Sequence, residues 1–279
     1  MSYSYGELNS VAVEQFSLVF ENEYQHNMRK LMNTTQEIHG VVGVDYVAKF
    51  ADAFDLADRG AFHSNIPRTP VQYRKELITM SNKTALVGSD IFEQALVNAS
   101  ELQNLARQSA WALARQQDQV IIDGMVASTP DNTVTAASNL TVDALREAKQ
   151  KLDDQDVPAD ERYIIATFSQ QRSLLGEEEA TNVDYNTIRT LVKGEIDTFY
   201  GFKFIWVADG MSTGGLPDPG GVRACYAWHR DSIITPYSIE PKIDKDWLPE
   251  SQQHILVPKV RLGSKVVRNN GIVKINCTE

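Results

Sequence analysis

The stretch that decides the fold spans residues 140–209 and reads LTVDALREAKQKLDDQDVPADERYIIATFSQQRSLLGEEEATNVDYNTIRTLVKGEIDTFYGFKFIWVAD. Its first part places Leu145, Ala148 and Leu152 at the spacing of one helix face, and the helix must stop before Pro158. The run RYIIAT predicts a buried strand, residues 169–175 predict a second short helix, and GFKFIWV predicts a closing strand. The stretch concentrates neither His nor Cys nor paired acids, so it predicts a scaffold rather than a catalytic centre.

The composition is typical of a folded protein with a sizeable core. The 279 residues are 42% hydrophobic and 23% charged. The longest apolar runs fall far short of the ~20 residues that span a bilayer, and no leader peptide is visible. We therefore expect a soluble protein made in the cytoplasm, without membrane contact. The net charge of −10 offers no basic footprint for gripping nucleic-acid phosphates.

Residues 9–31 carry large apolar side chains in steps of three and four, which predicts one face of an amphipathic helix. The face consists of Val13, Phe16, Phe20, Tyr24, Met28 and Leu31. Such a face needs a partner surface. The pattern leaves open whether the helix packs on its own subunit or forms an arm that docks on a neighbour.

Residues 40–87 predict a long hairpin. Val42, Val44, Tyr46 and Phe50 nearly alternate with polar residues, and a second extended stretch covers residues 72–80. Between the two lies a polar tip that nevertheless holds Phe62 and Ile66. A hairpin without a core of its own is marginally stable, so we expect this one to lie on another surface.

A long helix should follow. Ser89, Asp90 and Glu93 form a start signal of the capping-box kind, and no Gly or Pro occurs from residue 89 to 123. A helix running from there to about residue 127 would be nearly ~60 Å long, which suits a spine crossing a broad subunit. Beyond the 140–209 stretch, strands are predicted at residues 224–228, 254–260, 265–267 and 272–276. Asn270-Gly271 predicts a hairpin between the last two.

The sequence offers no credible catalytic set. Gly210-Met-Ser-Thr-Gly214 matches the G-x-S-x-G elbow of serine hydrolases, with Ser212 as nucleophile and Asp231, His229 or His254 as possible partners. The elbow needs a helix directly after the serine, and the Gly- and Pro-rich residues 215–221 cannot form one. The histidines and the two cysteines show no metal-ligand spacing, so neither a metal nor a cofactor is expected.

Six short motifs resemble the pattern of tailed-phage major capsid proteins of the Hong Kong 97 type. In that family a helix ending near Val-Pro leads to an Arg-Tyr strand, a short helix and a return of the form Gly-x-Ile followed by Gly-Phe. The corresponding residues here are Leu145 to Leu152, Val157-Pro158, Arg162-Tyr163, Leu174-Leu175, Gly194-Glu195-Ile196 and Gly201-Phe202. Each motif is short, and their order along the whole chain carries the resemblance.

The resemblance implies an α+β fold with four parts. Residues 1–39 would be an N-terminal arm and residues 40–87 an extended β-hairpin loop. Residues 88–135 and 251–279 would form a peripheral domain with a spine helix, and residues 136–250 a mixed α/β apical domain. Contacts between subunits would then be made by apolar residues of the arm and loop, namely Val13, Phe16, Phe20, Met28, Leu31, Phe62 and Ile66.

The resemblance also implies a function. The subunit would assemble with itself, as hexamers and pentamers, into an icosahedral head shell made in the bacterial host and found in the virion. The shell would enclose double-stranded DNA without sequence-specific binding, and a mildly acidic protein suits this because it does not adhere to DNA. Scaffolding and portal proteins, and a decoration protein in some relatives, are implied partners.

Three other readings stay open at this level, and one of them is a generic α+β binding module, which a monomeric species at high concentration would favour. An encapsulin-like compartment shell would share the fold but enclose protein cargo, and a serine hydrolase would use Ser212. Some relatives form Lys–Asn crosslinks, but no matching motif surrounds Lys49, Lys75 or Lys83, so that chemistry is not expected here.

Overall fold

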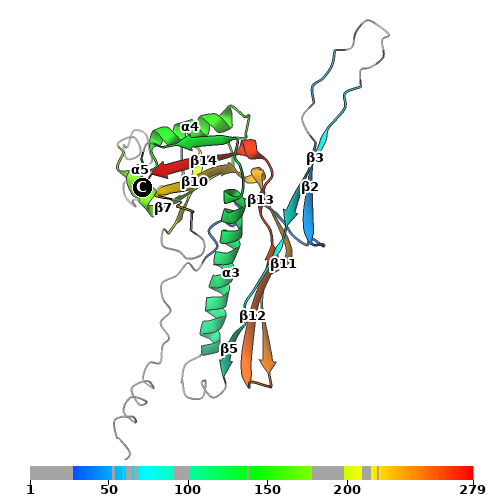
Figure 1. Cartoon of the computed structure of the whole chain (residues 1–279), viewed down its shortest axis with the longest axis vertical. Helices are drawn as coiled ribbons and strands as arrows, with labels where there is room; N and C mark the ends of the chain where they lie inside the picture. The colour runs from blue at the N-terminus through cyan, green and yellow to red at the C-terminus, as the bar shows by residue number, and fades with distance from the viewer. Residues whose placement is uncertain are drawn as a thin grey trace, which may run out of the picture.

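The structure is a computed structural model that describes residues 28–51, 54–58, 60, 65, 68–90, 101–136, 138–177, 198–208, 215–218 and 220–278. A sheet flanked by short helices lies at one end of the subunit, and the long helix α3 runs away from it beside a long β-ribbon. A separate hairpin projects on the other side (Figure 1). The α+β class and the elongated spine therefore agree with the sequence prediction.

The first sheet holds the main core. Among the described strands its order is β6-β14-β10-β7-β9-β8. Helix α4 (Val142–Asp153) packs on β6 and β14 with the predicted Leu145, Ala148 and Leu152 face buried, and α5 (Phe168–Leu175) lies against β7 and β9. The strands are β6 (Asn132–Thr135), β7 (Arg162–Thr167), β8 (Thr198–Phe199), β9 (Phe202–Val207), β10 (Val222–His229) and β14 (Ile272–Thr278).

The predicted Val-Pro and Arg-Tyr motifs mark one structural unit. Arg162 is 2% exposed, and its guanidinium donates to the carbonyls of Val157 (2.5 Å) and Pro158 (2.8 Å) and pairs with Asp153 (2.7 Å). The arginine therefore satisfies carbonyl groups in the turn that joins the end of α4 to β7. Thr141 caps α4, because its side chain accepts a hydrogen bond from the Ala144 N–H.

The spine helix was predicted with the correct end but the wrong start. Helix α3 spans Glu101–Val126, 26 residues or ~39 Å. Ser89 and Asp90 do not begin a helix; they belong to strand β5 (Val87–Asp90), which pairs with β12. The ladder with β12 satisfies their backbone groups, and this outweighs the local capping signal. Residues 91–100 lie outside the described part.

The second sheet contains an element that the sequence analysis missed. Strand β11 (Ile233–Leu248) pairs with β12 (Gln253–Leu262) to form the long ribbon beside α3. The order of the described strands is β1-β11-β12-β4, with β13 on β11 and β5 on β12. The remaining strands are β1 (Gln36–Ile38), β4 (Ser81–Thr84) and β13 (Lys265–Val266).

The predicted pairing of the last two strands was wrong. Asn270-Gly271 does not join a hairpin, because β13 pairs with β11 whereas β14 pairs with β10 and β6. Residues Asn269–Gly271 form a 3-10 turn instead. A Cβ at Gly271 would lie 2.0 Å from the Ser232 Oγ, so the glycine serves close packing rather than a β-turn.

The sheets also cut across the predicted domain limits. Residues 233–248, placed in the apical segment 136–250, pair with β12 in the second sheet. Residues 272–278, placed in the peripheral segment 251–279, lie in the first sheet with β10. Each limit was set by position in the chain, whereas the strands cross between the two sheets.

The predicted hairpin is present as β2 (Asp45–Ala51) and β3 (Tyr73–Thr79), paired antiparallel in full register. Residues 28–31, the end of the predicted N-terminal helix, are not helical. They follow the surface of the body instead, and β1 then pairs with β11 in parallel.

Candidate assembly surfaces

The β2–β3 hairpin has two unlike faces. On the inner face Ala48 and Ile78 are 3% and 1% exposed and pack against Ile234 and Val267 of the body. Tyr46 and Phe50, which the sequence analysis singled out, pack against the same small cluster. The even-numbered positions of β2 therefore attach the hairpin to its own subunit.

The opposite side, called here the outer hairpin face, consists of Val47, Lys49, Tyr73, Lys75 and Leu77. Val47 and Leu77 are directly paired and are 43% and 52% exposed, and Tyr73 is 74% exposed. Lys49 lies opposite Lys75, and like charges in that position destabilise a strand pair. The outer face is apolar and positively charged, and it covers no core of its own.

Three basic residues hold the root of the hairpin. The Arg74 guanidinium donates to the Val267 carbonyl (3.0 Å) and lies 5.7 Å from the centre of the Phe50 ring, and Arg268 lies 5.4 Å from the same ring. Lys265 pairs with Glu76 at 2.9 Å. These contacts fix the inner side of β3, so the direction in which the hairpin projects is set by the body.

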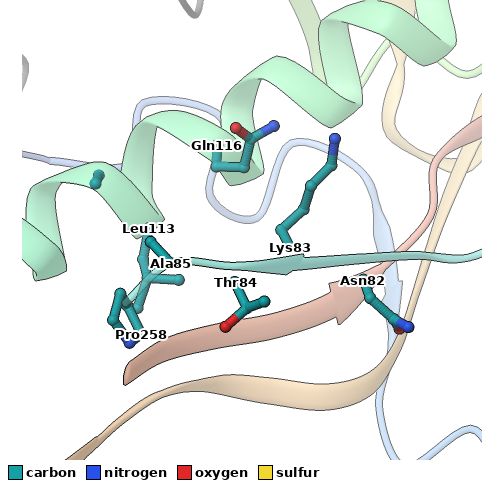
Figure 2. A pocket seen from close by; sticks show the side chains of 8 residues that line it. Asn82, Lys83, Thr84, Ala85, Leu113, Gln116 and Pro258 are labelled. Carbon is teal, nitrogen blue, oxygen red and sulfur yellow. The ribbon is translucent and has the colours of Figure 1, made fainter. Parts of the chain in front are cut away.

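A groove of about 210 Å³ lies between β4 and α3. Lys83 and Gln116 project into the space between strand and helix (Figure 2). Apolar atoms of Ala85, Leu113 and Pro258 supply much of its lining. Leu86, which follows the groove residue Ala85 in the chain, is 67% exposed. The groove therefore adds apolar surface on the side of the spine helix.

Between residues 28 and 31 the chain passes from the solvent-exposed surface into the core of the subunit. Met28 is 71% exposed, whereas Leu31 is 1% exposed within the main core. Leu31 was predicted as a contact between subunits, and this was wrong: its side chain is buried in its own subunit, so only Met28 of this pair is accessible. Thr34 and Thr35 continue the attachment, since the Trp228 Nε1–H donates to the Thr34 carbonyl at 2.8 Å and the two hydroxyls of Thr35 and Thr235 lie 3.0 Å apart.

The segment 29–31 binds the spine helix through Asp118. The carboxylate accepts the backbone N–H groups of Lys30 (2.8 Å) and Leu31 (3.1 Å). Burial raises the pKa of Asp118, and the hydrogen bonds and the positive charges of Arg29 and Lys30 oppose that shift. Burial lowers the pKa of Lys30, whose ammonium donates to the Trp206 carbonyl at 2.6 Å.

The other candidate contacts, Val13, Phe16, Phe20, Phe62 and Ile66, lie outside the described residues. The sequence analysis missed the outer hairpin face, although the alternation that it found in residues 42–50 implies a second face, which holds Val47 and Lys49. It also missed Asp118, for which a signal existed. Asp118 is spaced three, four and seven residues from Ile121, Ile122 and Met125, all buried, so a charged residue occupies a core-facing position.

Within the described part of the chain, the residues considered for hydrolase chemistry do not come together in one site. Ser212 lies outside the described residues. The His229 ring accepts the Asp231 N–H at the end of β10. His254 instead contacts Trp247 at the far end of the ribbon, roughly 40 Å along β11 from its start.

The described part of the chain shows neither a metal-binding cluster nor a membrane-spanning helix. Its His, Cys, Asp and Glu side chains form no cluster of three that could hold a metal ion. None of its helices is both long and apolar enough to cross a bilayer.

Comparisons with known proteins agree with this architecture. The family model described as phage capsid protein matches residues 8–279. No curated protein sequence shows significant similarity. A capsid structure of Helicobacter pylori bacteriophage KHP30 matches with a TM-score of 0.77 at 8% identity, covering 100% of this chain and 98% of that one. A structure from Mycobacterium phage Che8 matches at 0.73 and 19% identity, covering 93% and 95%. The PhiM1 mature capsid matches at 0.72 and 15%, covering 94% and 90%.

The family match spans nearly the whole chain, and the structural matches share its fold from end to end. The predicted resemblance to this family and the predicted fold class are thereby confirmed. The chain belongs to the phage capsid protein family, and it is a structural protein of the virion capsid.

Proposed function

We propose that this subunit builds a closed icosahedral head of hexamers and pentamers around double-stranded DNA, by overlapping its hairpin and N-terminal arm with neighbouring copies. The outer hairpin face carries the proposal. Fully burying an apolar side chain of the size of Val47 or Leu77 is worth about 1.5–3 kcal/mol. In a closed lattice the same contact repeats in each subunit, so modest contacts add up.

We propose that the arm contacts a neighbouring copy through Val13, Phe16, Phe20 and Met28, and that the loop tip does so through Phe62 and Ile66. Leu31 is left out because its own subunit buries it. Met28 supports this because it is 71% exposed directly before the chain enters the core. For the loop tip, Phe62→Asp should impair assembly more than subunit folding, as judged by particle yield and by the thermal midpoint of the free subunit. Equal losses of both would mean that Phe62 is a core residue of its own subunit.

Partners other than the subunit itself are part of the proposal. A scaffolding protein would supply the curvature, a portal would occupy one vertex, and a decoration protein could cover the outside. The net charge of −10 fits a shell that encloses DNA without binding its sequence. An enzymatic role for Ser212 has no supporting arrangement among the described residues.

Electron microscopy of the purified protein, assembled with its natural scaffolding protein, tests the proposal. We expect closed shells, and particles from infected cells should carry nuclease-protected DNA. Compact monomers under these conditions would contradict the proposal. Shells filled with a specific protein instead of DNA would favour the encapsulin-like alternative.

A further inference from the structure

Asp118 is a charged residue in a place where packing alone would favour an apolar one. It lies within α3 and is 2% exposed. Burial raises the pKa of its carboxyl group, which means that holding the charge here costs free energy. An apolar side chain of similar size would avoid that cost. A reason for the carboxylate must therefore come from what it binds.

The carboxylate binds a backbone segment. Its two oxygens accept the N–H groups of two successive residues, Lys30 at 2.8 Å and Leu31 at 3.1 Å. Two adjacent N–H groups on one carboxylate fix both the position and the direction of the peptide. The contact joins residues that are 88 and 87 positions apart in sequence, so it belongs to tertiary structure.

Neighbouring contacts tie the same short segment to three parts of the body. Arg29 pairs with Glu37 at 2.5 Å and lies 5.7 Å from the Tyr237 ring centre on the second sheet. The Lys30 ammonium donates to the Trp206 carbonyl of the first sheet at 2.6 Å. Asp118 provides the contact between the segment and the spine helix. One residue earlier, Met28 is 71% exposed.

We infer that Asp118 is a positioning residue for assembly: it fixes the point and the direction at which the N-terminal segment leaves the subunit body. The inference rests on the proposed docking of the arm on a neighbouring copy. If the exit shifts, the apolar residues Val13, Phe16 and Phe20 reach the neighbour in a different place. The subunit itself should still fold, because the main core is formed mostly by apolar side chains of the first sheet and of α4, which a change at Asp118 leaves in place.

Asp118→Asn tests the inference, with Asp123→Asn as the matched control. Asn keeps the size of the side chain, but its amide group presents N–H donors to one of the two backbone N–H groups, which is then left unsatisfied. Asp123 lies on the same helix, is exposed, and accepts a hydrogen bond from Gln119 one turn away. The same substitution there should have no effect.

Two readouts are needed. Trypsin cleaves after Arg29 and Lys30, and the wild-type contacts should protect these bonds in the folded subunit. At neutral pH, fragments beginning at Lys30 or Leu31 should form at least about tenfold faster in Asp118→Asn than in Asp123→Asn. Electron microscopy should show open or malformed particles for Asp118→Asn and closed particles for the control. Unchanged cleavage, or closed uniform particles, would overturn the inference.

A second pair of variants keeps the test decisive if Asp118→Asn does not fold. Lys30→Pro removes one of the two N–H donors and leaves α3 intact, whereas Lys30→Ala removes the ammonium and keeps the N–H. Malformed particles from Lys30→Pro with closed particles from Lys30→Ala would support the inference. Closed particles from both, or malformed particles from both, would overturn it.

A chain that starts at Met28 separates this inference from the proposed function. It lacks the arm but retains the segment that binds Asp118. If it forms normal shells, the proposed role of the arm fails. If it forms none while Asp118→Asn assembles normally, the arm is needed and only the role of Asp118 is wrong.

Discussion

The first sheet and the β2–β3 hairpin are built from the same alternating strand geometry, but only the sheet has a strand, β10, that its own chain covers on both faces. Strand β10 is buried at all but its first position, with α4 and α5 packed in the same core. In the hairpin the inner positions Ala48 and Ile78 are buried, while the paired Val47 and Leu77 stay exposed. One region completes its core within the subunit, and the other leaves one of its two faces exposed.

Under the proposed function, this difference separates the residues that stabilise the subunit from those that join it to neighbouring subunits. A residue of the sheet should affect folding first and assembly only as a consequence. A residue of the outer hairpin face should affect assembly while the free subunit stays as stable as before. The comparison is therefore open to direct test by substitutions that differ only in which region they change.

The largest effect is expected in the sheet. Trp228 is fully buried and also donates its Nε1–H to the Thr34 carbonyl at 2.8 Å. Trp228→Ala should lower the free energy of unfolding by about 3–5 kcal/mol, because it leaves a large cavity and an unsatisfied carbonyl. Urea unfolding of the free subunit measures this. A loss below about 1 kcal/mol would mean that the sheet is not the completed core described above.

Two neighbouring residues of β3 give the sharpest form of the comparison. Ile78→Ala removes an inner side chain that is 1% exposed and should cost about 2–4 kcal/mol of subunit stability. Leu77→Ala removes an outer side chain that is 52% exposed and should change stability by less than about 0.5 kcal/mol.

Leu77→Ala and Ile78→Ala should also differ in how they affect the assembly of particles. Leu77→Ala should reduce the yield of closed particles even though its unfolding curve matches that of the wild type. Particle counts by electron microscopy, beside urea unfolding of each free subunit, measure both quantities. If Leu77→Ala assembles as well as the wild type, the outer hairpin face is not a contact surface.

The sequence predicted the parts of the fold that local patterns determine. Helix α4 and strands β7 and β9 were found because spacing, capping and Pro158 all act within a few residues of each element. Strand β5 was missed because Ser89 and Asp90 satisfy a local helix signal, whereas their partners are His254 and Gln253, far along the chain. Pairing of that kind leaves no trace in a short window of sequence.

The assembly surfaces were predictable to a smaller extent. The alternation in β2 shows that two faces exist, but only the packing of Ile78 on Ile234 shows which face is inner. Leu31 follows the same spacing as Met28 and was assigned to a neighbour, although the body of the subunit buries it. Periodicity identifies a face that needs cover and does not say which chain provides it.

Gly263, at the boundary between the two regions, offers a third test, with an expected loss of stability between those above and the one below. A Cβ at Gly263 would lie 2.5 Å from the Thr79 carbonyl oxygen, at the root of β3. Gly263→Ala should therefore push the hairpin root away from the body and cost about 1–3 kcal/mol. Subunit unfolding measures the cost, and a stability equal to that of the wild type would show that the hairpin root yields without strain.

The smallest effect concerns the pH dependence of stability at Asp118, the residue that joins the entering chain to the completed core. Burial raises its pKa above the ordinary value of 3.8, so the folded state holds this proton at a pH where the unfolded state has released it. Its contribution is therefore fully present at low pH and is lost as the pH rises through the raised pKa. Arg29 and Lys30 act against this shift.

Asp118→Asn removes the titration and leaves the other carboxylates in place. The stability of the wild type minus that of the variant should therefore decrease from pH 3.8 upward and level off above the raised pKa. Urea unfolding of both free subunits at several pH values measures the difference. A difference that grows with pH would mean that the two N–H donors and the cations outweigh burial, and the carboxylate would then stabilise the entry segment at neutral pH more strongly than its buried position indicates.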